Sequence, residues 1–317
     1  MSRIAYVNGA YVPLAGAGVS VLDRGFQFAD SIYEVWAIRG GRLFDADAHM
    51  SRLRRSLNEL RIHFPMSDAA LYAVLRDTQR RNRVTDGIVY LQISRGAAPR
   101  DHVFPSLSVR PTIVVTAKNL DQSAIARRAA QGIKVITLPD TRWARCDIKS
   151  VNLLPNVLAR QTAKEKGAFE AWFVDEAGFV TEGTSSNAFI VDAQNRIRTA
   201  AISNHILHGV TRAALLAIAR DHQLKVVEEP FTTEEAKVAG EAFISAASNP
   251  AVPVVAIDAA QVGNGQPGPI AKALRAFYLG AEPENRRFEA ESGLAPERRT
   301  LMFAAQPRAR RGATKEA

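Results

Sequence analysis

The sequence predicts a protein of mixed α and β structure that is divided into two domains. Segments with alternating apolar residues, typical of strands, are interleaved with segments whose apolar residues recur at helical spacing. The length of 317 residues suits two domains of ordinary size, and no internal repeat is visible. A hydrophobic fraction of 47% beside a charged fraction of 23% is typical of a globular protein with a full core.

An N-terminal α/β domain is expected over residues 1–118. Asn8-Gly9 follows an alternating apolar run and predicts a two-residue hairpin turn, and Ser67 is placed to cap a helix. A second possible cap is Asp45 or Asp47, ahead of the helical spacing of Leu53, Leu57 and Leu60. The expected elements are hairpins over 3–13 and 31–44, helices over 45–62 and 66–82, and strands over 87–96 and 110–117.

A C-terminal α/β domain is expected over residues 133–282, after a polar interdomain linker region at 119–132. Pro155 suits the first helical residue of a helix, and Thr232 with Glu235 has capping-box spacing. The expected elements are a strand over 133–138, a helix over 155–167, hairpins over 170–183 and 187–200, and helices over 209–224 and 269–280. Periodicity fails beyond residue 282, so residues 283–317 are expected to be a basic, disordered tail.

The net charge of +9 raises the possibility of a nucleic-acid partner. Residues 298–317 hold six Arg and Lys side chains against one Glu, which leaves only +4 for the other 297 residues. The charge is therefore mostly a property of the tail, and neither a nucleic-acid nor a membrane partner is expected. No apolar run approaches the about 20 residues of a membrane span. A single cysteine and the absence of a secretory signal suit the cytoplasm.

Several common functional motifs are absent from the sequence. It contains no phosphate-loop motif, no glycine-rich dinucleotide fingerprint after a strand, no H-E-x-x-H and no paired cysteines. The six histidines, at 49, 63, 102, 205, 208 and 222, form no cluster at helical spacing. Nucleotide-hydrolysing, simple dehydrogenase and zinc-site functions therefore have no support, and no metal is expected.

Four local signals remain as candidates for chemistry. Lys149, in "RCDIKSVNLLPN", lies where the chain turns inward ahead of a helix, and a buried amine there would be a nucleophile. "VTEGTSSN" places Glu182 before a run of hydroxyl residues, and "HGVTR" offers a helix N-terminus that suits an anion. "SRGAAPRDHVFP" presents Arg100 and His102 in a loop, where a guanidinium can bind a carboxylate. Each has a simpler reading: a surface lysine, a polar turn, an ordinary helix cap and a solvated basic loop.

Taken in order and spacing, these segments resemble the class IV aminotransferases, which use pyridoxal 5'-phosphate. The segments that carry the resemblance are "DRGFQFADSIYEV", "SRGAAPRDHVFP", "RCDIKSVNLLPN", "VTEGTSSNAF" and "ILHGVTR", and it covers residues 1 to about 280. Arg-x-His after the Gly/Pro loop is similar to the D-amino-acid (D-alanine) branch. The resemblance implies fold type IV, with the cofactor at the interface of the two mixed α/β domains, and a homodimer.

The resemblance also implies a role for individual residues. Lys149 would be the catalytic residue that binds the cofactor covalently and moves the proton, and Glu182 would pair with the pyridine nitrogen. Tyr33, Arg100 and His102 would bind the substrate carboxylate. The other cofactor-binding residues implied are Arg52, Ser186, Leu207, Val210, Thr211 and Ser248. The phosphate turn departs from the family, because "FISAASNPAVPV" has Ala246 and Ala247 where Ser and Thr are usual.

The implied reaction moves the amino group of a D-amino acid such as D-alanine to a 2-oxo acid such as 2-oxoglutarate or pyruvate. The alternatives on the same scaffold are an L-branched-chain aminotransferase, an (R)-amine aminotransferase and aminodeoxychorismate lyase, and the Arg100–His102 pair weighs against all three. An alternative of another class is a basic binding protein that acts through residues 298–317. Nothing in residues 1–280 supports it.

Overall fold

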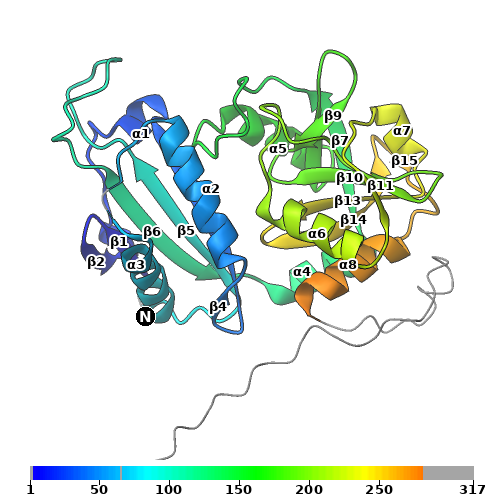
Figure 1. Cartoon of the computed structure of the whole chain (residues 1–317), viewed down its shortest axis with the longest axis horizontal. Helices are drawn as coiled ribbons and strands as arrows, with labels where there is room; N and C mark the ends of the chain where they lie inside the picture. Colours follow the sequence, from blue (N-terminus) through cyan, green and yellow to red (C-terminus); the bar gives the residue numbers. More distant parts are fainter. Residues whose placement is uncertain (1–2, 65, 281–317) are drawn as a thin grey trace, which may run out of the picture. The chain divides into compact units, whose positions relative to one another are not determined.

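Two β-sheets organise the part of the chain that the computed structural model describes, which is residues 3–64 and 66–280 (Figure 1). Both sheets belong to one compact unit of the chain. The chain passes from the first sheet to the second through helix α4 (Gln122–Gln131), which lies inside the segment expected to be a linker. The basic tail predicted for residues 283–317 lies outside the described residues.

The first sheet is antiparallel throughout. Its strands, in spatial order, are β2 (Ala10–Pro13), β1 (Ile4–Val7), β6 (Thr112–Asn119), β5 (Gly87–Ser94), β3 (Ser31–Arg39) and β4 (Arg42–Leu43). The two hairpins predicted from the sequence are confirmed. Asn8 and Gly9 adopt φ values of 46° and 100°, the left-handed conformation that a two-residue hairpin turn requires.

Two helices, α2 (Ala46–Glu59) and α3 (Asp68–Arg81), pack on this sheet. Their apolar side chains and those of the strands form one core, in which Trp36, Leu53 and Leu71 are at most 1% exposed. Ser67 caps α3 as predicted, since its hydroxyl accepts from Ala70 N. The predicted cap of α2 is different: Asp45 precedes the helix but makes no side-chain cap bond, because its carboxylate accepts from the Tyr278 hydroxyl.

The second sheet is mixed, with parallel pairs β11–β12, β14–β7 and β7–β8. Its main path, in spatial order, is β12 (Lys225–Val227), β11 (Arg196–Arg198), β10 (Asn187–Val191), β13 (Glu241–Ala246), β14 (Asn249–Ile257), β7 (Ile133–Pro139), β8 (Glu170–Val174) and β9 (Val180–Gly183). The short strand β15 (Ala260–Gln261) pairs with β14. The predicted hairpins β8–β9 and β10–β11 are confirmed, whereas the sequence reading did not assign β13 and β14.

Helices on the second sheet follow the expected connections. Helix α5 (Leu154–Glu165) connects the parallel strands β7 and β8, since parallel neighbours need a crossover. Helix α6 (Val210–Asp221) and helix α8 (Pro269–Leu279) both contact β13, and α8 also contacts β14. The short helix α7 (Thr233–Lys237) begins with the predicted capping box of Thr232 and Glu235. Apolar side chains of this sheet form a core that includes Trp172, Phe231 and Val252.

The segment between β7 and α5 is held by the first sheet. Ile148 is 4% exposed and belongs to the core that β3, β5 and α2 form. Tyr33 N donates to Lys149 O at 2.9 Å, and Val151 N donates to Ser31 O at 3.1 Å. The segment therefore pairs with the start of β3, which fixes Lys149 between side chains of the two sheets.

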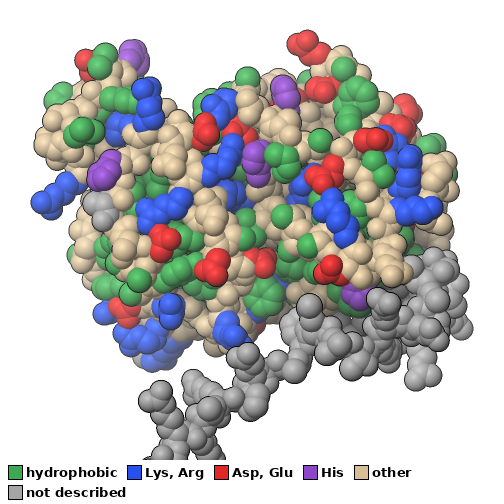
Figure 2. Space-filling model, in the orientation of Figure 1, with side chains coloured by type: hydrophobic (Ala, Val, Ile, Leu, Met, Phe, Trp, Pro, Cys, Tyr) green, Lys and Arg blue, Asp and Glu red, His purple; other side chains and the backbone are tan. Residues whose placement is uncertain are grey.

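Charged side chains of both signs are spread over one face of the described part of the molecule. On the face shown in Figure 2, Lys and Arg side chains are interspersed with Asp and Glu side chains. None of the described helices is both long enough and apolar enough to span a membrane.

Candidate active site

A cavity of about 330 Å³ brings together most of the residues that the sequence selected. Its wall combines β3 and α2 of the first sheet with the β7–α5 segment, β9, the start of α6 and the β13–β14 turn of the second. The predicted site residues in this wall are Tyr33, Arg52, Lys149, Glu182, Ser186, Leu207, Val210, Thr211 and Ser248. Among the described residues, no group of three or more His, Cys, Asp or Glu side chains is placed to hold a metal ion.

Lys149 extends its amine along the aromatic ring of Tyr33. Nζ lies 4.1 Å from the ring centroid, and the backbone N–H of Lys149 donates to the Ser56 hydroxyl at 3.3 Å. Lys149 is half-buried, between the buried residues Ile148 and Ser150. Lys149 lies in the segment that connects β7 to α5, which begins at Leu154. The placement of Lys149 therefore depends on the pairing of this segment with β3.

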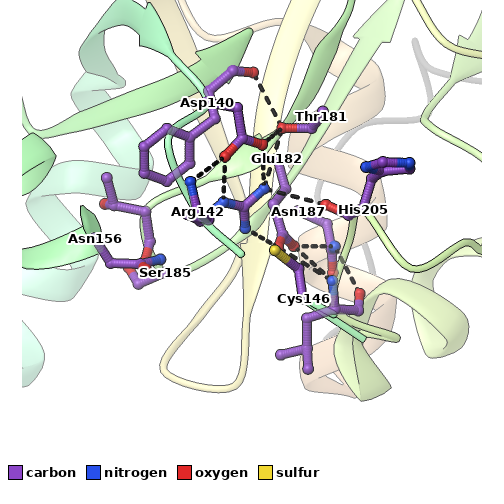
Figure 3. A network of polar contacts seen from close by, with 12 residues as sticks. Asp140, Arg142, Cys146, Asn156, Thr181, Glu182, Ser185, Asn187 and His205 are labelled. Carbon is purple, nitrogen blue, oxygen red and sulfur yellow. Dashed lines mark hydrogen bonds and ion pairs between the residues drawn. The ribbon is translucent and has the colours of Figure 1, made fainter. Parts of the chain in front are cut away.

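Glu182, on β9, accepts hydrogen bonds from three residues, Asn187, Leu207 and Arg142 (Figure 3). Asn187 Nδ2 donates to Oε2 at 3.1 Å, Leu207 N donates to both carboxylate oxygens at 3.0 and 3.1 Å, and Arg142 Nη1 donates to Oε1. The residue is 5% exposed. Burial raises the pKa of Glu182, against the opposing effects of Arg142 and Lys149. The carboxylate is thus fixed in orientation in the wall of the cavity.

Arg142 is bound on its other side by Asp140. Its Nε and Nη2 donate to the two oxygens of Asp140 at 2.9 and 2.7 Å, and Nη2 also donates to the Thr181 hydroxyl and to His205 O. Two carboxylates therefore share one guanidinium, and the cluster keeps one net negative charge when both are ionised (Figure 3). Such a cluster suits a cationic group in the cavity beside Glu182.

The sequence reading missed Arg142, Asp140 and Asn187. Asp140 and Arg142 follow the end of β7 directly, where polar side chains gather at a sheet edge, and that was the one available signal. Their pairing with Glu182 spans about forty residues of sequence and depends on the order of β7, β8 and β9. No short motif contains it.

A second part of the wall, the N-terminus of α6, suits an anion. Helix α6 has Gly209 as its N-cap with no side-chain cap bond, so backbone N–H groups at Val210 and Thr211 remain available to a ligand. Because Gly209 has no side chain, Asn187 can lie close to the backbone of this turn: a Cβ at position 209 would lie 2.0 Å from Asn187 Oδ1. Thr211 is 3% exposed and Leu207 lies two residues before the cap.

Arg52, on α2, projects from the first sheet toward α6. Its Nε and Nη2 donate to Glu34 at 3.0 and 2.6 Å, and Nη1 donates to His208 O at 3.1 Å. Glu34 is fully buried, and His49 Nδ1 lies 2.9 Å from it. Burial acts to raise the pKa of Glu34, but the charge of Arg52 and the hydrogen bonds from His49 and Arg52 lower it well below its usual value. Arg52 is thus held rigidly by a carboxylate behind it.

The predicted hydroxyl ligands are placed differently from one another. Ser186 donates to the buried carboxylate of Glu170 at 2.6 Å, so its proton is directed away from a ligand. Ser248 lies in the wall beside Ala246 and Ala247, and its hydroxyl accepts from Asn249 Nδ2. Ser245, which the sequence reading did not select, has a buried hydroxyl with no hydrogen-bond partner among the described residues.

Arg100 and His102 lie outside the cavity wall of their own chain. Both are exposed in the loop between β5 and β6. Arg100 lies over the Phe28 ring, 4.9 Å from its centroid, and the His102 ring is 5.4 Å from the same ring. The single chain therefore brings Tyr33 to Lys149 but does not bring Arg100 and His102 there.

Comparison with known proteins identifies the family to which this chain is similar. The family model described as amino-transferase class IV matches residues 31–257. The D-alanine aminotransferase of Staphylococcus haemolyticus is 39% identical over 271 residues, which cover 85% of this chain and 94% of that protein. The D-alanine aminotransferase of Bacillus licheniformis is 39% identical over 268 residues, covering 84% and 93%.

Solved structures agree on the fold. The T.th. branched-chain amino acid aminotransferase, solved with pyridoxamine 5'-phosphate, is 26% identical, with a TM-score of 0.79 and coverage of 94% of this chain and 96% of that one. The Escherichia coli branched-chain amino acid aminotransferase has a TM-score of 0.80 at 24% identity, with coverage of 90% and 97%. A family match over most of the chain, and relatives that align over nearly their full length, show that this chain belongs to the class IV aminotransferases.

Proposed function

We propose that this protein is a D-amino-acid aminotransferase. It moves the amino group of a D-alanine-like donor to a 2-oxo acid such as 2-oxoglutarate or pyruvate, with pyridoxal 5'-phosphate as cofactor. The observation that carries the proposal is one cavity in which the Lys149 amine, the Glu182 carboxylate and the N-terminus of α6 all line the wall. Relatives named D-alanine aminotransferase, 39% identical over nearly their whole length, support the D-amino-acid branch.

The residues present fit pyridoxal 5'-phosphate by their chemistry. Glu182, backed by the charge of Asp140, would hold the ring nitrogen in its protonated form, and Leu207 would pack on the ring. Arg52 and the N–H groups of Val210 and Thr211 would hold the phosphate. When bound, the cofactor supplies an electron sink for the negative charge that develops at the substrate α-carbon.

The phosphate turn is where the fit departs from the family pattern. Ala246 and Ala247 offer no hydroxyl, and Ser186 already donates to Glu170. Ser248 and the hydroxyl of Ser245, which has no hydrogen-bond partner in the described part of the chain, remain in the wall as donors. We infer that phosphate binding relies more on Arg52 and the α6 N-terminus than the family pattern implies.

Lys149 performs the proton transfer in this proposal. Its Nζ would hold the cofactor covalently, and the free amine would accept the proton of the substrate α-carbon and deliver it to the bound cofactor. The Tyr33 ring, 4.1 Å from Nζ, limits the directions in which the amine can extend. Cys146 also lines the cavity, but burial raises its pKa to about 11, so it is a neutral thiol there.

We further propose that the active form is a homodimer, in which Arg100 and His102 act on the cavity of the partner subunit. Within one chain these side chains do not line the cavity, although their loop carries exposed apolar residues, with Val103 73% and Leu107 94% exposed. An exposed apolar loop of this kind is suited to contact with a second chain. Because the sequence has one cysteine, we propose the reducing cytoplasm as its compartment.

A second candidate function is an L-branched-chain aminotransferase. The observation that favours it is the structural similarity to two solved branched-chain enzymes, with TM-scores of 0.79 and 0.80. Arg100 and His102 weigh against it, as they do against an (R)-amine aminotransferase and aminodeoxychorismate lyase. Initial rates with D-alanine and with L-leucine, both with 2-oxoglutarate as acceptor, separate the two candidates.

The direct test of the cofactor assignment is an absorbance spectrum of the protein with pyridoxal 5'-phosphate. The wild type should show a visible band from the lysine-bound cofactor, and Lys149→Ala should lose that band. Lys164→Ala, which removes an exposed lysine of α5, is the matched control and should retain it. A visible band of equal intensity in Lys149→Ala, or no band in the wild type, would overturn the proposal.

A further inference from the structure

The backbone of the loop that carries Arg100 and His102 is held from below by one buried arginine. Arg24, in helix α1 (Arg24–Phe28), is 4% exposed. Its Nη1 donates to Asp101 O at 2.5 Å and to Val103 O at 3.3 Å, and its Nη2 donates to His102 O at 3.4 Å. Three consecutive carbonyls of the loop thus accept from a single guanidinium, which fixes the backbone between them.

A second arginine, Arg95, contacts the next residue of the loop, Phe104. Asp30 accepts from Arg24 Nε at 2.8 Å and from Arg95 Nε and Nη2 at 2.7 and 2.9 Å. The Arg95 guanidinium lies 3.6 Å from the centroid of the Phe104 ring. Burial would raise the pKa of Asp30, but the hydrogen bonds from Arg95 and Arg24 lower it, so both arginines have an ionised partner. The loop from Asp101 to Phe104 therefore rests on two arginines that share one ionised carboxylate.

The side chains of Arg100 and His102 rest on the same helix. The Phe28 ring has the Arg24 and Arg100 guanidinium carbons each 4.9 Å from its centroid, and the His102 ring 5.4 Å away. Phe28 ends α1, and the next residue, Ala29, takes a left-handed conformation with φ 57°. This turn leads into β3, which carries Tyr33.

We propose that Phe28 and Arg24 are positioning residues for substrate-carboxylate recognition, because they set the placement of Arg100 and His102. This inference rests on the proposed function, in which Arg100 and His102 bind the carboxylate of the amino donor. The Phe28 ring orients the side chains of Arg100 and His102, and Arg24 fixes the backbone of the loop through its hydrogen bonds. Neither residue touches the reacting atoms, so the effect falls on substrate binding and not on proton transfer.

The test uses the holoenzyme with Phe28→Leu, which keeps an apolar side chain of similar size but removes the ring. A contact between a cation and a ring corresponds to about 3- to 30-fold in binding. We expect the KM for D-alanine to rise about 3- to 30-fold while kcat stays within about 2-fold. Inhibition by propionate, a carboxylate without an amine, should weaken in parallel, and inhibition by ethylamine should not change.

Three further variants complete the design. Phe28→Tyr keeps the ring and should restore the KM. Phe44→Leu is the matched control, since Phe44 is also half-buried and lies under a guanidinium, that of Arg39 at 4.3 Å, away from the loop. Arg24→Lys keeps the charge but loses the forked donors, and should raise the KM for D-alanine without a comparable loss of kcat.

The outcomes separate the inference from the function beneath it. If wild type turns over D-alanine and Arg100→Leu raises its KM, the function stands. Equal KM values for Phe28→Leu and Phe44→Leu would then overturn the positioning role, as would a loss of kcat with an unchanged KM. A wild type that does not turn over D-alanine would overturn both.

Discussion

Replacing Arg142 with Met would leave two carboxylates without their cation. Arg142, Glu182 and Asp140 have side chains that are 5%, 6% and 13% exposed, so water cannot replace the lost donors well. Removing one partner of a buried ion pair typically costs about 3–5 kcal/mol, because the remaining charge stays buried and unpaired. We expect Arg142→Met to lower the free energy of unfolding by about that amount at pH 8.

The same change predicts a specific pH dependence. Burial raises the pKa values of Glu182 and Asp140, and Arg142 lowers them through its charge and hydrogen bonds. Without Arg142 we expect both pKa values in the folded state to lie above their ordinary values of 4.5 and 3.8. A carboxyl group whose pKa is raised by folding destabilises the folded state when the pH lies above its unfolded value. The difference between variant and wild type should therefore narrow as the pH falls from 8 toward about 4.

Urea unfolding of the cofactor-free protein at pH 8 and pH 5 measures both effects. Arg80→Met is the matched control, because Arg80 also pairs with a carboxylate, that of Asp77, but is 74% exposed. An exposed pair contributes only about 0–1 kcal/mol. If Arg142→Met and Arg80→Met lowered the free energy of unfolding by the same amount, burial would not set the energetics of the Arg142 cluster.

Three other predictions follow from the cavity and its walls. Glu34→Gln should reduce the loss of stability that acid causes between about pH 5 and pH 2. Folding lowers the pKa of Glu34, so its carboxylate stabilises the fold above its unfolded pKa and loses that contribution as the pH falls. Urea midpoints across this range measure the effect, and a variant whose stability falls with pH as steeply as that of the wild type would contradict the role of Arg52. The Cys146 thiol, with a pKa of about 11, should react with iodoacetamide at pH 8 about 100-fold more slowly in folded than in urea-unfolded protein, and equal rates would contradict its burial. Gly209→Ala should weaken cofactor binding, measured by absorbance titration, because the added Cβ would displace Asn187 from Glu182 at a cost of about 1–3 kcal/mol; unchanged affinity would show that the turn relaxes freely.

Many local elements were predictable because short-range physics determines them. The Asn8-Gly9 turn, the Ser67 cap and the Thr232–Glu235 capping box depend on residues within a few positions of one another. Asp45 shows the limit of that reasoning. It stands at the correct position for a cap, but its carboxylate is used by Tyr278, more than two hundred residues away.

The candidate site divides in the same way. Lys149, Glu182 and the α6 N-terminus lie in short motifs whose resemblance to one family was visible, and the structure brings all three to one cavity. Arg142 was not predictable, because its pairing with Glu182 needs β7 and β9 on either side of β8 in the second sheet. The placement of Arg100 outside the cavity of its own chain was not predictable either, because the exposure of a loop depends on tertiary structure.

The sequence by itself determined the family, the mixed α and β composition and the local turns and caps, and it predicted Lys149 as the reactive lysine. The tertiary structure decided which strands are neighbours, which carboxylates share a guanidinium, and that the Arg100 loop lies outside its own cavity. The physical reason is range. Backbone conformation and capping depend on neighbours along the chain, whereas ion pairing and burial depend on contacts between distant segments that only the folded chain brings together.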